Sequence, residues 1–396
     1  MSRLSDFKGR VVRPTSRGLH ALVSHAKDLG FVMSRKAAFT LIFCSGAGLL
    51  FAQERSATTP SREPKEMFER AIAQAESATA ISHQVKDIFA RAAKAVVKIH
   101  GMDEHGPICG TGFFIDPTGT LYTAYDVGGE ASDFTIEFGG KKYPARQLLA
   151  DIRSGTAMLK IDGATPALPI GKYQELEVAT PVVSVGYPLD LPETPNFGMI
   201  AGFDRKYRGR YFSTTHVRLN LPSQRGEAGA PLLNMKGEVV GIVVSSLENN
   251  SACYAVPIEV AEKLRSDYIR FGEARHGWIG INVSTARQPV EGSLAEMTQI
   301  ERGSPAANSG IKSGDILLQV GQRKVTQPED VPDASFFITA GDVVPITVVR
   351  GNQKMTFNVQ ATLHPRQLLD GAPAAAALPS PQTLPLSLGS DVPPSP

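Results

Sequence analysis

The hydrophobic pattern of the chain first predicts a helix and then a long β-rich region. Apolar residues recur at helical spacing across Glu66–Ala95, which predicts a helix that packs against a neighbour or an oligomer partner. From Ala95 to about Val260 the pattern changes to short apolar runs, such as Val239–Val244, separated by Gly, Pro, Asn and Asp. Many short strands at this spacing predict an antiparallel sandwich or barrel.

A second helix and a further β-rich unit follow. Helical periodicity returns over Pro257–Phe271 and stops at Gly272, a typical helix-ending residue. The next unit, Gly277 to about His364, mixes strands and turns with two short helical pieces. We expect these pieces at Gly303–Ser309 and around Asp333–Thr339.

Composition gives limits rather than a function. The chain has 396 residues, of which 42% are apolar and 20% charged, and its formal net charge is +2. That length allows two or three domains with ample cores. The charge balance gives no reason to expect a nucleic-acid partner. The last 26 residues contain seven prolines and an alanine run, which predicts a disordered tail.

The first residues have the order of a targeting segment. Up to Lys36 there are eight Lys or Arg against two Asp, and Ala37–Ala52 is then uncharged and mostly apolar. This order is typical of an export signal. The apolar stretch has 16 residues, fewer than the ~20 that a membrane-spanning helix needs. An uncleaved membrane anchor remains the alternative, and Met33 is an alternative start that keeps only Arg35 and Lys36 as the basic region.

One segment carries a specific motif. Gly226–Gly241 reads GEAGAPLLNMKGEVVG and resembles the nucleophile loop of HtrA-type, trypsin-like serine proteases, which typically begins G-N-S-G-G-P. Four further segments resemble the same family in the same order: Gly110–Gly119, Asp151–Asp162, Val183–Pro188 and Tyr254–Ile258. The resemblance implies a mainly β fold with a trypsin-like double β-barrel.

The three catalytic positions of that family hold other residues here. Its T-N-A-H-V-V segment matches Thr123–Gly128, so Asp126 stands at the histidine position. Its S-D-L-A-V-L-K segment places Gly155 at the aspartate position, and the nucleophile loop places Ala228 at the serine position. Such catalysis needs a hydroxyl, an imidazole and a carboxylate, so we predict no catalytic residues and an inactive protease homologue.

Substitute nucleophiles or a metal site elsewhere in this region remain alternatives. Ser223 lies five residues before Ala228, but nothing near it in the sequence supplies a base. Cys109 could pair with His100 or His105 as a thiol and imidazole, or form a zinc site with both. The spacing is typical of neither chemistry, so we expect surface histidines, a buried thiol, no metal and no cofactor.

The cysteines have two interpretations. Cys109 and Cys253 remain outside the targeting segment and could form a disulfide in an oxidising compartment. The family's fold would place them in different barrels, so we prefer two separate buried thiols.

The last unit resembles the PDZ domain of the same family. Gly277, Trp278, Ile279, Gly280 and Ile281 match its G-Y-L-G-I loop, and Gly303–Leu317 resembles G-S-P-A-A-x-A-G-L-K-x-G-D-x-I. PDZ domains bind an extended peptide along a sheet edge, while loop N–H groups hold its terminal carboxylate. We therefore predict peptide binding at Gly277–Ile281, with Phe336 and Phe337 either lining the side-chain groove or packing in the core.

These inferences give a domain organisation and a function. We expect a targeting segment at 1–53, a linker and helix at 54–94, a double-barrel domain at 95–272, a PDZ domain at 273–365 and a disordered tail at 366–396. The protein would be exported, to a bacterial periplasm or outside the cell, and would bind peptide or protein ligands as an adaptor, holder or regulator. The resemblance also implies a homotrimer and an active protease relative as partners. An active endopeptidase remains the alternative.

Overall fold

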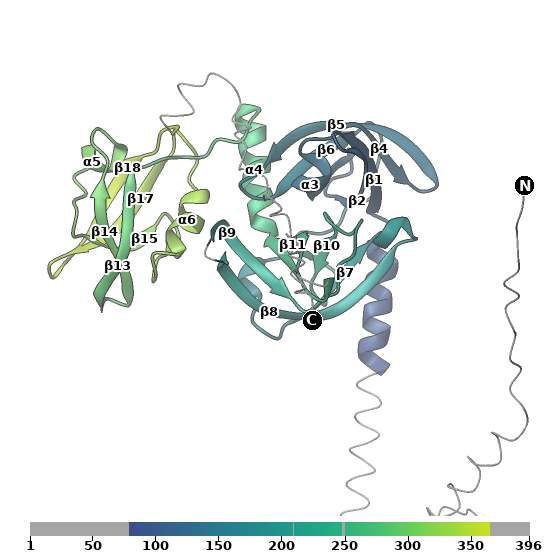
Figure 1. Cartoon of the computed structure of the whole chain (residues 1–396), viewed down its shortest axis with the longest axis horizontal. Helices are drawn as coiled ribbons and strands as arrows, with labels where there is room; N and C mark the ends of the chain where they lie inside the picture. The colour runs from purple at the N-terminus through teal and green to yellow at the C-terminus, as the bar shows by residue number, and fades with distance from the viewer. Residues whose placement is uncertain (1–78, 209, 248–249, 365–396) are drawn as a thin grey trace, which may run out of the picture. The chain divides into compact units, whose positions relative to one another are not determined.

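The computed structural model describes residues 79–364 except 209, 248 and 249 (Figure 1). Two closed antiparallel barrels are followed by a separate antiparallel sheet, which confirms the predicted mainly β fold. Residues 79–92 are helical, as the periodicity predicted. The expected targeting segment, the linker, the first part of the helix and the tail lie outside the described residues.

Six strands close the first barrel in the order β1-β2-β3-β6-β5-β4. They are β1 (Val96–Asp103), β2 (Gly106–Phe114), β3 (Thr120–Ala124), β4 (Ser132–Phe138), β5 (Lys141–Asp151) and β6 (Thr156–Ile161). Apolar side chains such as Ile99, Phe113 and Leu121 fill its interior without exposure to solvent. The one-turn helix α3 (Tyr125–Gly128) directly follows β3.

The second barrel closes in the order β10-β11-β12-β9-β8-β7. Its strands are β7 (Pro181–Gly186), β8 (Thr194–Tyr207), β9 (Arg210–Leu219), β10 (Pro231–Leu233), β11 (Val239–Ser246) and β12 (Cys253–Pro257). The short 3-10 turn η2 (Pro188–Asp190) connects β7 to β8. Helix α4 (Ile258–Phe271) follows β12, contacts both barrels and ends at Gly272 in the left-handed region, as predicted.

The third unit is a sheet in the order β13-β14-β15-β17-β18, with β16 paired to β15. Its strands are β13 (Ile281–Val290), β14 (Ser293–Ile300), β15 (Ile316–Val320), β16 (Arg323–Lys324), β17 (Val343–Arg350) and β18 (Gln353–Gln360). Helix α5 (Pro305–Asn308) falls where the sequence predicted it. Helix α6 spans Asp330–Phe336, about three residues earlier than predicted.

Helix α6 connects this sheet to the second barrel through a buried carboxylate. Asp333 is 4% exposed and accepts hydrogen bonds from the Thr215 N–H and hydroxyl of β9. Arg323 of β16 donates to Asp333 at 2.8 Å and also pairs with Glu259 of α4. A buried charge is stable only when it is fully paired, so this cluster fixes the position of α6.

Phe336 of α6 packs in the core rather than lining a groove. Its side chain is fully buried and belongs to the apolar cluster of the barrels. Phe337 is partly buried, and the Arg323 guanidinium lies 3.5 Å from its ring centroid. For Phe336 the core alternative is therefore correct.

A second buried contact joins the start of the third unit to the first barrel. His276 Nε2 lies 2.9 Å from Asp151 Oδ1, and both side chains are 7% exposed. Burial lowers the pKa of His276, while the hydrogen bond to Asp151 opposes that shift. Desolvation raises the pKa of Asp151, but hydrogen bonds from His276 and Ser154 and the nearby Arg153 charge together outweigh it and leave this pKa lowered, so the pair combines a neutral imidazole with a carboxylate.

Within the described residues, every helix is too short or too polar to cross a bilayer.

The Asp333 cluster generates a stability prediction. Asp333→Ala removes the acceptor for Thr215 and Arg323, and we expect a loss of about 3 kcal/mol in the free energy of unfolding. Urea unfolding followed by circular dichroism measures it. Asp342→Ala, which breaks the solvent-exposed pair with Arg270, is the control and should change stability little. Equal effects of the two substitutions would contradict the role of Asp333.

The His276–Asp151 pair generates a pH prediction. Because the pKa of His276 is lowered on folding, the unfolded chain binds an extra proton below its own histidine pKa of about 6.5. Stability should therefore fall as the pH drops from about 7 towards the lower pKa of the folded state, by at most about 1.4 kcal/mol per pH unit. His276→Gln should flatten this slope, whereas His105→Gln, at an exposed turn, should not.

Candidate functional site

The three positions singled out by the sequence lie in three segments that meet around β2 and the end of β3. Asp126 lies in α3, Gly155 in the turn between β5 and β6, and Ala228 in the loop before β10. The Tyr125 N–H donates to the Gly155 carbonyl at 2.8 Å, and the Thr111 N–H donates to the Ala228 carbonyl at 2.9 Å. Backbone contacts therefore hold this site together, independently of the side chains at the three positions.

Two glycines in the loop before β10 allow this close approach. Gly226 has φ +98 and Gly229 has φ +89, a backbone region that other residues rarely adopt. A Cβ atom on Gly226 would overlap the Tyr187 carbonyl oxygen, and one on Gly229 would overlap Thr111 and Thr123. The loop conformation therefore requires glycine at both positions.

The buried Thr111 hydroxyl, from β2, ties the loop to the first barrel. It donates to the Gly226 carbonyl at 2.7 Å and accepts from the Tyr187 N–H at 3.1 Å. The Leu189 N–H of η2 donates to the Arg225 carbonyl at 2.7 Å. The Gly226–Ala228 backbone is thus fixed in place, as a pocket for a carbonyl or carboxylate oxygen would need.

The side chains at the site offer little catalytic chemistry. Ala228 ends at Cβ and Gly155 has no side chain. Partial desolvation, reinforced by the Glu130 carboxylate, raises the pKa of Asp126 above its ordinary value. A carboxyl group of this kind can accept or donate a proton, but a serine-type reaction also needs an activated nucleophile.

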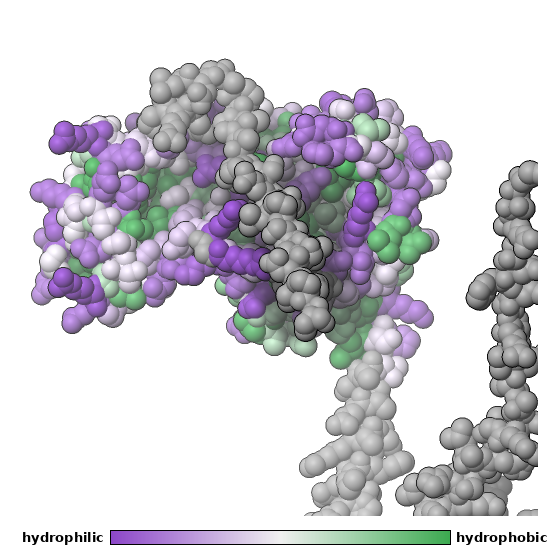
Figure 2. Space-filling model, in the orientation of Figure 1, coloured by the Kyte–Doolittle hydropathy of each residue, from purple (hydrophilic) through white to green (hydrophobic). Residues whose placement is uncertain are grey.

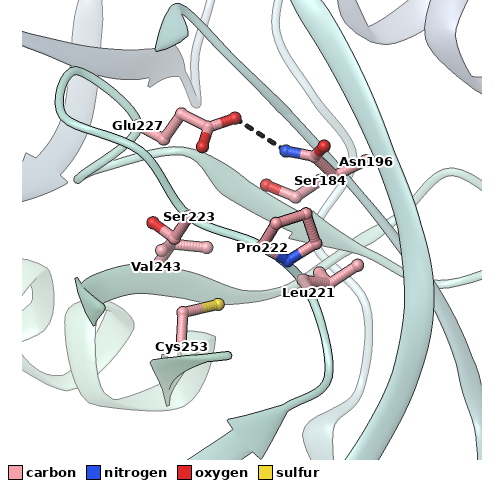
Figure 3. A pocket seen from close by; sticks show the side chains of 8 residues that line it. All are labelled: Ser184, Asn196, Leu221, Pro222, Ser223, Glu227, Val243 and Cys253. Atoms are coloured by element: carbon pink, nitrogen blue, oxygen red, sulfur yellow. Dashed lines mark hydrogen bonds between the residues drawn. The ribbon is translucent and has the colours of Figure 1, made fainter. Parts of the chain in front are cut away.

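Ser223, one of the alternative nucleophiles, points into a small pocket of the second barrel (Figure 3). Its side chain is buried, and the pocket is too small for a water molecule. Glu227 and Cys253 line the same pocket, and Asn196 donates to Glu227 at 2.6 Å. Burial raises the pKa of Glu227 and raises that of the Cys253 thiol to about 12. The pocket contains no histidine, so Ser223 has no imidazole base there.

Cys109 and His100, another alternative, do come together. They are opposite each other in the β1–β2 ladder, and with Asp190 of η2 their ligand atoms all lie within 4.8 Å of one another. Cys109 Sγ lies 3.7 Å from Asp190 Oδ1. Desolvation and the Asp190 carboxylate raise the pKa of the Cys109 thiol, which disfavours the nucleophilic thiolate.

The expected surroundings of these residues need two corrections. His105 lies exposed on the hairpin turn, but the Nε2 atom of His100 is buried and has no hydrogen-bond partner among the described residues. Cys109 is half-buried rather than buried. Cys109 and Cys253 are free and lie in different barrels, so the interpretation as separate thiols is correct and the disulfide is not formed.

The predicted peptide-binding loop precedes an edge strand of the third sheet. The N–H groups of Gly277 and Trp278 donate to the carbonyls of Ile338 and Thr362, so both are already used within the domain. Ile279, Gly280 and Ile281 remain as candidates for holding a carboxylate, which stays a prediction. Gly280 has φ +77, and a Cβ there would overlap Ser304, the N-terminal cap of α5.

Sequence reasoning missed two residues near the site. Glu227 faces inward beside Ser223, although its place in the nucleophile loop was visible in the sequence. Asp190 reaches Cys109 from the other barrel, and no motif indicated this.

The comparisons with known proteins agree with the two-part fold. A family model described as trypsin-like peptidase domain matches residues 110–242, and a PDZ domain model matches 277–361. A probable periplasmic serine endoprotease, DegP-like, of Pseudomonas fluorescens is 27% identical over 64% of this chain and 56% of its own length. A protein of the same description from Rhizobium meliloti is 27% identical over 67% and 55%. The chain thus spans about half the length of these curated relatives.

Solved structures show the same arrangement. The HtrA-type protease AlgW with a tripeptide is 20% identical, with a TM-score of 0.61 over 71% of this chain and 97% of that one. The serine endoprotease from Yersinia pestis is 25% identical, with a TM-score of 0.53 over 71% and 98%. Together these findings show a trypsin-like peptidase domain followed by a PDZ domain, an organisation similar to that of HtrA/DegP-type proteases.

The geometry of Gly280 generates a binding prediction. Gly280→Ala puts a Cβ into a left-handed backbone position and against Ser304, so we expect the loop to deform and peptide binding to be lost. Fluorescence anisotropy with peptides selected on an array of C-terminal sequences measures this. Gly351→Ala, at φ +61 in the open β17–β18 turn, is a matched control that should retain binding. Loss of binding in both variants would point to general destabilisation instead.

Proposed function

We propose that this protein is a catalytically inactive homologue of HtrA-type proteases that binds peptide segments or C-termini through its PDZ domain. It acts as an adaptor, a holder of unfolded segments or a regulator in the cell envelope. The observation that carries the proposal is the combination of Asp126, Gly155 and Ala228 at the three matching positions of a trypsin-like site.

The expected loss of catalysis is large. In model serine proteases, removing the serine or the histidine lowers turnover on the order of a million-fold. The remainder is on the order of a thousand-fold over water and comes from binding and the oxyanion pocket. Here the matching positions hold neither residue. The fixed Gly226–Ala228 backbone would still hold a carbonyl or carboxylate oxygen without cleaving a peptide.

Peptide binding is supported by the third unit and by similar structures. The residues that match the PDZ model form the sheet whose edge strand is β13. AlgW has been solved with a tripeptide and with a decapeptide. We infer that the loop Ile279–Ile281 holds the carboxylate and that the peptide adds to β13.

Exposed apolar side chains support contact with a protein partner. Leu189 and Leu191 near η2 are 60% and 55% exposed, and Phe197 and Met199 on β8 are also exposed. On the face drawn in Figure 2, hydrophobic residues lie in patches among hydrophilic ones. A second copy of the chain, as in a homotrimer, or an active protease relative would cover such side chains.

Export to the periplasm is supported by the descriptions of the relatives and by the basic and apolar N-terminal segment. The names of those relatives also favour a second candidate function. In that case the protein would be an active serine-type endopeptidase in protein quality control, with unorthodox catalytic residues.

Turnover of casein or a fluorogenic peptide by the purified protein distinguishes the two functions. The proposal predicts no turnover above that of buffer. Activity that disappears in Asp126→Ala, Ser223→Ala or Cys109→Ala would establish an active enzyme, because a contaminating protease is indifferent to these substitutions.

The site geometry also predicts how activity could be created. In Gly155→Asp the new Cβ makes only ordinary van der Waals contact with Val244, and aspartate tolerates the φ of +73 better than most residues. The triple variant Asp126→His, Gly155→Asp and Ala228→Ser should therefore gain measurable peptidase activity. The peptidase activity of each single variant should stay at the background level, because the three groups act as a unit. A single Ala228→Ser variant with full activity would show that another base is already present.

A further inference from the structure

A thiol, an imidazole and a carboxylate meet where the β1–β2 hairpin approaches η2, outside the three positions described above. They belong to Cys109, His100 and Asp190, and their ligand atoms all lie within 4.8 Å of one another. From this geometry we propose that Cys109, His100 and Asp190 form a binding site for a zinc-class divalent metal ion. The proposal is independent of whether the protein cleaves peptides.

The hairpin between β1 and β2 sets the first two ligands. The turn pairs Asp103 with Gly106, and the continuous register places His100 opposite Cys109. Opposed residues of an antiparallel pair project from the same face with their Cβ atoms about 5 Å apart. The strand register therefore holds the imidazole and thiol together whether or not a metal is bound.

The distances between the ligand atoms fit tetrahedral coordination of one ion after small side-chain movements. Zinc binds sulfur at about 2.3 Å and nitrogen or oxygen at about 2.0–2.2 Å, so two ligand atoms of one ion lie roughly 3.5 Å apart. Cys109 Sγ and Asp190 Oδ1 are already 3.7 Å apart. Closure around the ion needs a further side-chain shift of about an ångström.

One nitrogen of His100 is available as a ligand. Its Nε2 atom is buried without a hydrogen-bond partner among the described residues. Such an atom costs free energy unless something binds it, and a metal ion would satisfy it. Glu137 Oε2 lies 3.5 Å from this nitrogen and can approach the fourth position or orient the ring.

Lys98 is the competing cation at the site. Its ammonium lies 2.9 Å from Asp190 Oδ1, at the carboxylate that would bind the metal. The same ammonium donates to the Asp190 main-chain carbonyl and lies 5.2 Å from the centre of the Tyr187 ring. Lys98 therefore keeps two contacts when the carboxylate turns to the metal.

The chemistry of the donors selects the ion. A thiolate and an imidazole favour zinc or cobalt over calcium or magnesium, which prefer oxygen ligands. Binding also has a structural consequence, because Leu189, next to Asp190, is hydrogen-bonded to the Arg225 carbonyl. A bound ion would join the β1–β2 hairpin to η2 and brace the backbone that leads into Gly226.

Cobalt titration of the full chain, freed of metal by a chelator, tests the site. We expect one Co²⁺ per chain with a thiolate-to-cobalt charge-transfer absorption, and displacement by Zn²⁺. Cys109→Ser should abolish the absorption, and His100→Ala should weaken binding by more than about 100-fold, since even outer residues of metal sites change affinity by about 10–100-fold. The matched controls are His105→Ala, Cys44→Ser and Cys253→Ala, and each should retain the charge-transfer absorption.

The Lys98→Met variant tests the proposal most directly. The Lys98 side chain is only 13% exposed, so methionine fits in its place, and the substitution removes the cation that competes with the metal. This variant should bind Co²⁺ more tightly than the wild-type chain. Absence of the charge-transfer band, its survival in Cys109→Ser, or weaker binding in Lys98→Met would each overturn the proposal. The first of these results would mean that any bound ion sits on surface carboxylates only.

Discussion

The backbone contact between the Gly226–Gly229 loop and the first barrel is the constraint on which the rest of the structure depends. Thr111 provides it through its N–H bond to Ala228 and its hydroxyl bond to Gly226, in a place without solvent. The contact needs glycines at two positions and a small hydroxyl at a third. None of the side chains at Asp126, Gly155 and Ala228 takes part, so the contact does not depend on which side chains stand at these three positions.

Features that depend on local sequence signals could be predicted, whereas features that depend on contacts between distant segments could not. The barrels, α4 and the third sheet were predictable, because their glycines and apolar runs are local signals of turns and strands. Helix α6 begins earlier than expected because Asp330 accepts hydrogen bonds from the N–H groups of Thr326 and Gln327 and so fixes the preceding turn. Phe336 was ambiguous in the sequence, since only the docking of α6 on the barrel buries it.

The candidate site shows the same division. Asp126, Gly155 and Ala228 could be located from motifs, and in the structure the segments that carry them meet around β2 and the end of β3. The pairing of His100 with Cys109 follows from the length of the hairpin once its turn is known. Asp190 could not have been found, because it comes from the other barrel and nothing local indicates its partner. A contact between residues that lie far apart in the sequence can be identified only in the three-dimensional structure.

The central proposal is that the site around Asp126, Gly155 and Ala228 contains no activated nucleophile. Incubation of the purified protein with a fluorophosphonate, followed by intact mass spectrometry, tests it most directly, because such reagents modify an activated hydroxyl covalently. The account predicts an unchanged mass for the native chain. A stoichiometric adduct on Ser223 or on another residue of the loop before β10 would contradict it.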